Sequence, residues 1–265
     1  MKTTNRMHSS WCLLLNIVAG LYFFTGPAYA SLIAHYSFNS DFTDESGNAN
    51  HLIEGFGTPT ISTTAGEFAL GGGALDLDST TSNKEYLNLT TPITFGAGDP
   101  WSVAFWARHR PGNDRRAGMI VGDLTSTDFI WIPRDGVVAG IRFRSSSGEN
   151  ADYNIDVQPA GVFHHWALIA DGVGSIEVYY DNASLGAQSS DTTLTITSVG
   201  QAFNETVHSM NGQIDELYLY DDAIDAAKIN TLFLRVPEPN TLILLGSGCL
   251  ILLFRRRSPV LKVDG

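Results

Sequence analysis

Short apolar runs separated by turn residues repeat along residues 31–235, and this pattern constrains the fold more than any other feature of the chain. Runs such as WSVAFWARH, FIWIP and SIEVYYDN are short and apolar or alternating, and Gly, Asn, Asp and Ser stand between them. Many short strands with such turns are typical of antiparallel sandwiches and jelly rolls. We therefore predict an all-β domain of two packed sheets.

One strand can be assigned a position within its sheet. In residues 101–109, alternation places Val103, Phe105 and Ala107 on one face and Ala104, Trp106 and Arg108 on the other. Because both faces carry aromatic side chains, we expect this to be a central strand.

Residues 221–233 are the only part of the body that favours a helix. Ile224, Ala227, Ile229 and Leu232 follow near-helical spacing, and Asp221 or Asp222 is positioned to cap the start. We expect a short helix packed against the last strand. Residues 58–76 are rich in turn residues and are predicted to form a loop.

The N-terminus is predicted to be a signal peptide, residues 1–30. Lys2 and Arg6 precede a largely apolar run, and a small-x-small pattern that signal peptidase recognises ends at Ala30. Cleavage there would leave an exported chain that begins at Ser31. The alternative, an uncleaved membrane helix, is disfavoured because the apolar run is short and a cleavage site follows it.

The exported body has no cysteine, because Cys12 and Cys249 both lie in terminal apolar segments. Its stability must therefore come from core size, sheet closure or a bound ion. Residues 31–236 contain 10 Lys and Arg against 26 Asp and Glu, and 10 minus 26 gives a formal charge of −16. We expect no nucleic acid partner. Divalent cations fit this charge better, although an acidic surface also simply keeps an exported protein soluble.

Three segments resemble laminin-G-like, concanavalin A-like jelly-roll domains. They are LIAHYSFNSDFTDESGNANHLI, GVFHHWALIADGVGSIEVYYDNASLG and NGQIDELYLYDDAIDAAKINTLF, in the order of the family's opening strand, central hairpin and closing strand with its helix. The resemblance implies a jelly roll of two antiparallel sheets over residues 31–235 whose first and last strands pair. It does not imply one activity, because this fold hosts enzymes, lectins and adhesion modules.

Related jelly rolls often hold one structural Ca²⁺, so the resemblance also implies an ion site where the opening turn meets the last strand. We predict Asp44, Asn48 and Asp215 as ligands, together with backbone carbonyls, because calcium prefers about six to eight oxygen ligands. The alternative is that Asp44, Ser46 and Asn48 only make hydrogen bonds within their turn.

Glycoside hydrolases that resemble this fold carry paired acids that alternate along one strand, because one carboxyl must protonate the leaving oxygen while another attacks or activates water. Here Asp215 and Glu216 are neighbours, so alternation predicts that they point to opposite faces. Asp221 and Asp222 lie past the predicted end of the strand. We therefore expect no enzymatic activity and no catalytic residue, with a carbohydrate-active enzyme of the glycoside hydrolase kind as the alternative.

Trp131 is the predicted ligand-binding residue, because it lies near a loop where its ring can stack on a sugar. The other three tryptophans of the body are expected mainly in the core. His164 and His165 are adjacent in a predicted strand, so they face opposite ways and do not bind one metal together. His165 matches the family's strand histidine, which implies a structural role.

Residues 236–257 have three parts in a fixed order: a stiff Val-Pro-Glu-Pro segment, an apolar run at 241–254, and a basic cluster. The sorting residues are Pro237, Glu238, Pro239, Arg255, Arg256 and Arg257. This arrangement resembles the PEP-CTERM sorting signal of exopolysaccharide-producing Gram-negative bacteria, which implies recognition and cleavage by an exosortase.

The 14-residue apolar run would span about 21 Å as a helix, against about 30 Å of hydrocarbon. It therefore favours transient membrane insertion, with a retained tail anchor as the alternative. Residues 258–265 form a short tail, which departs from signals that end close to their basic cluster.

Together these features predict an exported, non-enzymatic jelly-roll module on the outer surface or in the extracellular matrix of a Gram-negative bacterium, such as a biofilm matrix, reached through an inner-membrane intermediate. Signal peptidase and an exosortase are the expected partners during export. Exopolysaccharide or a surface protein is the expected ligand, and a structural matrix protein without a discrete ligand is a further alternative.

Overall fold

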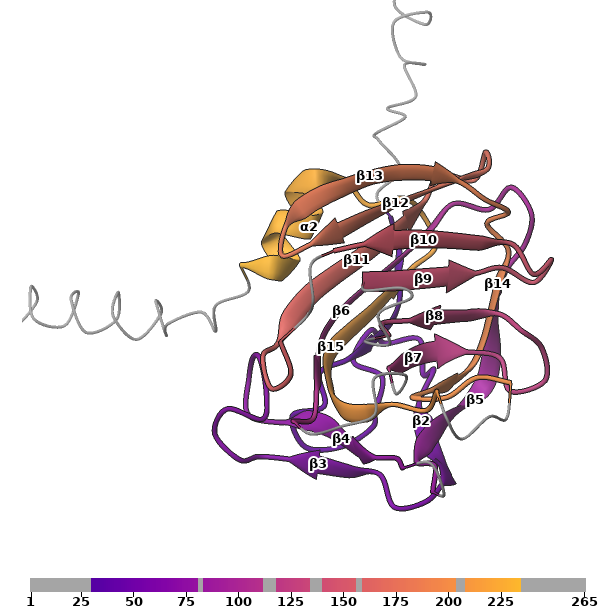
Figure 1. Cartoon of the computed structure of the whole chain (residues 1–265). Coiled ribbons are helices and arrows are strands. Elements are labelled where there is room, and N and C mark those ends of the chain that lie inside the picture. The colour runs from indigo at the N-terminus through magenta and orange to yellow at the C-terminus, as the bar shows by residue number, and fades with distance from the viewer. Residues whose placement is uncertain are drawn as a thin grey trace, which may run out of the picture.

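The computed structural model describes residues 30–80, 83–111, 118–133, 140–155, 159–203 and 208–234. In these ranges, fifteen strands form two antiparallel sheets, and one helix follows the last strand (Figure 1). No helix in these ranges is long and apolar enough to cross a membrane. The predicted signal peptide up to residue 29, and the predicted sorting residues with the apolar run at 241–254, lie outside the described residues.

The eight-stranded sheet contains the first and last strands of the fold. Its order is β13 (Ala183–Ser189), β12 (Ser175–Tyr180), β11 (His164–Ala170), β6 (Trp101–His109), β15 (Asn211–Tyr220), β4 (Ala74–Asp78) and β3 (Thr60–Ser62). β1 (Leu32–Tyr36) pairs with the second half of β15, from Leu217 to Tyr220. The predicted pairing of first and last strands is therefore confirmed.

The seven-stranded sheet packs against it. Its order is β10 (Asn150–Asn154), β9 (Gly140–Arg144), β8 (Phe129–Trp131), β7 (Met119–Gly122), β14 (Leu194–Val199), β5 (Tyr86–Phe95) and β2 (Leu52–Phe56). All pairings in both sheets are antiparallel, as the all-β jelly-roll prediction requires.

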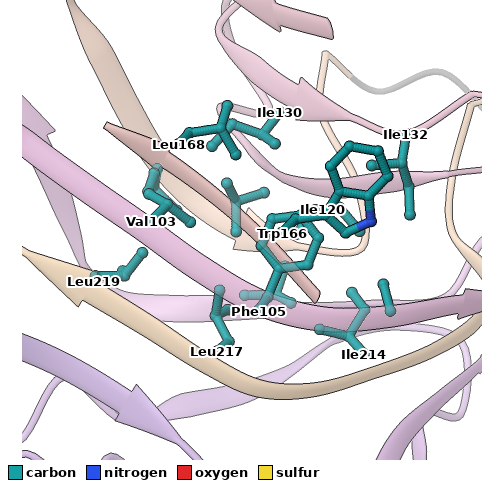
Figure 2. Packing of buried hydrophobic residues seen from close by; sticks show 14 of the residues in the cluster. Val103, Phe105, Ile120, Ile130, Ile132, Trp166, Leu168, Ile214, Leu217 and Leu219 are labelled. Atoms are coloured by element: carbon teal, nitrogen blue, oxygen red, sulfur yellow. The ribbon is translucent and has the colours of Figure 1, made fainter. Parts of the chain in front are cut away.

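The main core fills the space between the sheets. The fully buried residues include Trp166, Phe105 and Leu168 from the eight-stranded sheet and Ile120 and Ile130 from the other (Figure 2). Burial of each such side chain contributes about 1.5–3 kcal/mol. This large core explains how a domain without cysteine in its body gains its stability.

Alternation correctly predicted the faces of β6. Val103, Phe105 and Ala107 belong to the main core, whereas Trp106 on the other face stacks on Phe233 from the C-terminal helix. β6 lies between β11 and β15, so it is a central strand covered on both sides.

The helix α2 (Ala226–Phe233) packs on the outer side of the eight-stranded sheet. Ile229 and Leu232 join Tyr218 and Tyr220 of β15 in a second apolar cluster, as predicted for a helix on the last strand. The predicted cap is wrong: Asp225 caps the helix, and its carboxylate accepts a 2.8 Å hydrogen bond from the amide of Lys228. Residues 221–225 do not join the helix, which begins later than the spacing predicted.

The loop prediction for residues 58–76 holds only in part. Thr60–Ser62 forms β3, and Ala74 begins β4, with which β3 pairs. The segment between them, residues 63–72, crosses the outer side of the eight-stranded sheet and has no buried residue. We call this segment the strap.

Candidate functional site

The outer faces of the two sheets differ in what covers them. The covered face is the outer face of the eight-stranded sheet, where α2 and the strap lie. The open face is the outer face of the seven-stranded sheet, on which no helix of the described residues packs (Figure 1).

On the covered face, a β-bulge brings Asp215 and Glu216 to the same side of the sheet. The register between β15 and β6 shifts between Asp215 and Tyr218, and Glu216 has a left-handed φ of 49°. Ile214 and Leu217 both point into the main core, so the two acids between them lie on the outer side. The predicted opposite orientation of the acids is therefore wrong.

Each acid has its own partners. The Glu216 carboxylate lies 2.8 Å from His35 Nε2 and accepts a hydrogen bond from the Tyr218 hydroxyl. The rings of His35 and Tyr218 stack, with centroids 4.2 Å apart. Asp215 and Glu216 are 0% and 6% exposed. Both carboxyls are thus enclosed by protein groups, and neither presents an open acid to a polysaccharide chain.

Asp215 fastens the strap to the sheet. Its Oδ2 accepts hydrogen bonds from the amides of Ala69 and Leu70, at 2.8 and 2.9 Å. Burial raises the pKa of Asp215 to about 7, and the nearby charge of Glu216 acts in the same direction, while the amide hydrogen bonds oppose both. The carboxyl therefore changes its protonation state near neutral pH.

Arg108 is the second attachment of the strap. Its guanidinium donates to the carbonyl of Gly66 at 2.7 Å, forms an ion pair with Glu67 at 3.3 Å, and donates to Gln213 of β15 at 2.6 Å. The strap is therefore held by polar contacts to Asp215 and Arg108.

The two adjacent histidines of β11 point to opposite faces, as alternation predicted. His165 pairs in register with Trp106 and is 1% exposed, and burial lowers its pKa to about 4, so the ring is neutral at physiological pH. His164 Nδ1 lies 2.7 Å from the Asp181 carboxylate and 2.8 Å from the Tyr180 hydroxyl.

The Asp44 carboxylate accepts hydrogen bonds from the opening turn and from β1. Oδ1 accepts from the amides of His35 and Ser46, and Oδ2 accepts from the Ser46 hydroxyl and the amide of Asn50, at 2.8–3.0 Å. Burial alone would raise the pKa of Asp44, but these hydrogen bonds outweigh it and lower the pKa. The carboxylate is therefore charged, and four donors already satisfy its oxygens.

The remaining predicted calcium ligands have separate partners. Asn48 donates to the carbonyls of Leu32 and Ile33, whereas Asp215 accepts from the strap. In the described parts of the chain, no three His, Cys, Asp or Glu side chains are grouped so as to hold a metal ion. These contacts fit the turn alternative better than an ion cage, and calcium stays a prediction.

The open face carries an exposed apolar patch at its β2 edge. Ile53 and Phe56 are each 51% exposed, and they pair in register with Asn88 and Tyr86 of β5. The rings of Phe56 and Tyr86 stack, with centroids 6.2 Å apart. The Lys84 ammonium lies 5.5 Å from the centre of the Phe56 ring. We call these five residues the aromatic patch.

A bulge creates this patch. The register of β2 shifts between Glu54 and Phe56, so Phe56 faces outward with Ile53, although alternation from Leu52 would turn it inward. Gly55 lies in the bulge, and a Cβ there would come within 2.5 Å of the Tyr86 ring. A lone glycine inside a strand is the sequence signal that could have revealed the patch.

Trp131 also lies on the outer side of the seven-stranded sheet, but it is only 5% exposed. The Arg142 guanidinium lies 5.7 Å from the ring centre, and His208 meets the ring edge-on at 5.0 Å. Arg142 forms a bidentate ion pair with Asp152, at 2.6 and 2.7 Å. Sugar stacking on Trp131 stays a prediction, and it would require these neighbours to move.

The predicted signal peptidase site lies beside the last strand. The Ser31 amide donates to the Asp221 carboxylate at 2.8 Å, and the Asp221 amide donates to the Ser31 carbonyl at 3.1 Å. Ala30 packs against the same cluster as α2. The first described residues are therefore fixed to the covered face.

Comparison with protein families gives two matches. The profile described as the concanavalin A-like lectin/glucanases superfamily matches residues 81–230, more than half of the chain. The PEP-CTERM protein-sorting motif matches residues 235–258, directly after α2. The second match confirms the predicted sorting signal, which indicates export to the surface or exterior of a Gram-negative bacterium with processing by an exosortase.

Solved structures with a similar fold include a domain of an arabinanase and binding domains of toxins. Domain 4 of AbnA, a GH43 extracellular arabinanase from Geobacillus stearothermophilus solved with arabinotriose, has a TM-score of 0.60 and 20% identity, over 77% of this chain and 98% of that one.

The binding domain of Paraclostridial Mosquitocidal Protein 1 has a TM-score of 0.54 and 15% identity. The receptor binding domain of botulinum neurotoxin D has a TM-score of 0.53 and 14% identity. Each match covers 77% of this chain and 52% of the toxin domain, so the chain spans about half of their length. At these identities the likeness establishes the fold alone. No curated protein sequence matches the chain.

Proposed function

This chain belongs to the concanavalin A-like lectin/glucanases superfamily, and from that premise we propose that it is an exported surface or extracellular-matrix protein that binds polysaccharide through the aromatic patch. Sorting by an exosortase delivers the jelly roll to the exterior. There the domain recognises a sugar chain without cleaving it.

The stacked pair of Phe56 and Tyr86 is the observation that carries this proposal. Exposed aromatic side chains beside one another are unfavourable in water, and contiguous apolar patches on soluble proteins often mark interaction sites. Sugars have an apolar ring face that can stack on an aromatic ring. Asn88 pairs in register with Ile53, so its side-chain amide, which can both donate and accept hydrogen bonds, lies at the patch beside the rings.

The placement of the sorting motif also supports the open face as the ligand surface. The motif begins at residue 235, one residue after Leu234 and two after the end of α2, which packs on the covered face. The aromatic patch belongs to the other sheet. A ligand can therefore approach the patch whether the sorting segment is retained or removed.

The structural neighbours agree with a binding role. One is a domain solved with arabinotriose, and two are binding domains of toxins. Their identity to this chain is too low to assign a ligand to it. The arabinotriose complex nevertheless makes an oligosaccharide a suitable first probe.

Binding without catalysis is proposed because the acidic pair on β15 is enclosed. Asp215 is tied to the strap, and Glu216 is tied to His35 and Tyr218. A glycoside hydrolase needs two carboxyls that reach the scissile bond from the substrate side. The enzyme alternative is retained as an outcome of the test.

A glycan array probed with the protein exported by its own host tests the proposal. We expect binding to a neutral polysaccharide, and Phe56→Ala or Tyr86→Ala should weaken it about three- to tenfold, as expected for the loss of one aromatic contact. Val173→Ala is the matched control, because Val173 is 88% exposed in the turn between β11 and β12, away from the patch.

The other outcomes separate the alternatives. Binding that both patch variants leave unchanged would reject the patch, and Trp131→Ala would then be tested as the second candidate. Sugar release from the host polysaccharide would favour an enzyme. An array without any bound glycan would favour a protein ligand or a purely structural matrix role, and a pull-down with host surface proteins would distinguish those two.

We also propose that the exported chain passes through an inner-membrane intermediate, inserted transiently through residues 241–254, before an exosortase cuts near Pro237, Glu238 and Pro239. Mass spectrometry of the protein from its native host tests this step. A mature chain that ends near these residues is expected, whereas a mature chain that still contains Arg255 would contradict processing.

A further inference from the structure

Three polar side chains stand side by side across the covered face. His165 of β11 pairs in register with Trp106 of β6, and Trp106 pairs with Asp215 of β15. Directly opposite residues of antiparallel strands have Cβ atoms about 4.5–5.5 Å apart and point to the same side. We call these three residues the polar row.

Each member of the polar row has one buried polar atom without a hydrogen-bond partner in the described residues. These atoms are His165 Nδ1, Trp106 Nε1 and Asp215 Oδ1. His165 and Asp215 are almost fully buried, at 1% and 0% exposure. A buried polar atom without a partner destabilises the fold, so three on neighbouring residues point to a shared partner.

Trp166 shows that an unpartnered indole alone would not support this inference. Its Nε1 is also buried without a partner, but it lies in the main core among aliphatic and aromatic side chains such as Ile132 and Phe105 (Figure 2). The Tyr180 ring packs on the Trp166 ring, with centroids 4.6 Å apart. Such apolar surroundings do not hold water, whereas the polar row offers three polar groups together.

The surroundings of the polar row favour a neutral occupant. Phe233 of α2 packs on the rings of Trp106 and His165, with centroids 5.6 and 5.8 Å away. Arg108 is engaged by Gln213 and the strap, and Glu216 by His35. The charged neighbours therefore already have partners. An indole N–H donor, a carboxyl oxygen and an imidazole nitrogen together match a group that can both donate and accept.

We propose that His165, Trp106 and Asp215 form a binding site for one hydroxyl oxygen beneath the α2 and strap cover. The Trp106 indole donates to this oxygen, and the oxygen donates to Asp215 Oδ1. His165 Nδ1 makes the third hydrogen bond to this oxygen, as donor or acceptor. The oxygen comes from a buried water or from the hydroxyl of a small sugar. The site is separate from the aromatic patch and does not rest on the proposed function.

A high-resolution crystal structure of the exported protein, determined without sugar and again after soaking in glucose, tests this site. In sugar-free crystals we expect an ordered oxygen within hydrogen-bond distance of Trp106 Nε1 and Asp215 Oδ1. Retention of that water after soaking assigns the site to solvent, and its replacement by a glucose hydroxyl assigns it to a sugar. Both results support a hydroxyl site.

Two tryptophan variants supply the matched comparison. Trp106→Phe removes the indole donor and should abolish the oxygen peak, whereas Trp166→Phe removes the equally unpartnered indole of the core and should leave the peak intact. If glucose is the source, Trp106→Phe should also weaken glucose binding about tenfold, which corresponds to the loss of one hydrogen bond.

The wild-type crystal alone can overturn the proposal, even if a variant fails to fold. An absent oxygen, or a direct hydrogen bond between Trp106 Nε1 and Asp215 Oδ1, would show that the three residues need no further partner. Failure of glycan binding at the aromatic patch would leave this result unaffected, so the two proposals fail independently.

Discussion

The two outer faces of this jelly roll differ in exposure: one encloses its acidic side chains, and the other leaves aromatic side chains open to solvent. On the covered face, the acids are enclosed and paired, and a helix and a strap lie over them. On the open face, aromatic side chains remain exposed at the β2 edge. Each face is shaped by a β-bulge, at Glu216 and at Gly55 respectively. The difference shows that a bulge can bury acids on one sheet and expose rings on the other.

The variant with the largest expected effect on stability weakens the contact between α2 and the covered face. Ile229→Ala should lower the free energy of unfolding by about 2–5 kcal/mol, because Ile229 is fully buried and its loss leaves a cavity. Urea unfolding measures this change. Thr231→Ala, at an exposed position of the same helix, is the control. If the faces have separate roles, glycan affinity should stay unchanged under native conditions, and a parallel loss of affinity would contradict the separation.

A smaller effect is expected from the acid that holds the strap. The pKa of Asp215 is raised from its ordinary value of 3.8 to about 7, so the folded chain holds this proton more tightly than the unfolded chain. The resulting stability is fully present below about pH 3.8 and is lost as pH rises through about 7. Its size is of the order of 1–4 kcal/mol.

Asp215→Asn should remove the loss of stability at high pH, because the amide side chain keeps an oxygen for the strap amides but carries no charge. The variant should therefore be more stable than the wild type at pH 8, and thermal unfolding between pH 4 and pH 8 measures the difference. Asp222→Asn, beyond the end of β15, is the control. A variant that is less stable than wild type at pH 8 would mean that the charged carboxylate itself stabilises the strap.

The same two bulges also explain what the sequence could and could not predict. Alternation correctly placed Val103 and Trp106 on opposite faces of β6, because that strand is regular where it crosses its neighbours. It failed at Glu216, where a non-glycine residue adopts a left-handed φ that composition does not reveal. At Phe56 it would also have failed, although Gly55 was a readable signal. Alternation of inward and outward side chains therefore predicts the regular strands, whereas the acidic pair and the aromatic patch lie at bulges, where alternation is interrupted.

A weaker perturbation tests the open face through its bulge. Gly55→Ala places a methyl group 2.5 Å from Tyr86 ring atoms, so the ring must move away from Phe56. We expect glycan affinity to fall about three- to tenfold, while the free energy of unfolding changes by about 1 kcal/mol or less. Isothermal titration calorimetry with a glycan selected from the array measures the first change.

Gly72→Ala in the strap is the control for this variant, since a Cβ there meets only Asn39 Oδ1, at 3.9 Å. Equal losses of affinity in both glycine variants would show that the effect does not arise at the aromatic patch. A loss confined to Gly55→Ala would assign ligand recognition to the patch that its bulge creates.

The smallest expected effect concerns calcium, where the covered face and the opening turn meet. Asp44 accepts three hydrogen bonds from its own turn and one from the His35 amide of β1, and Asp215 accepts hydrogen bonds from the strap, so a calcium ion would have to displace these donors. We therefore expect the melting temperature to be the same with calcium and with a chelator. Binding of an ion to the folded chain alone would raise it with calcium concentration. A rise that Asp44→Asn abolishes would mean that the opening turn rearranges to hold the ion.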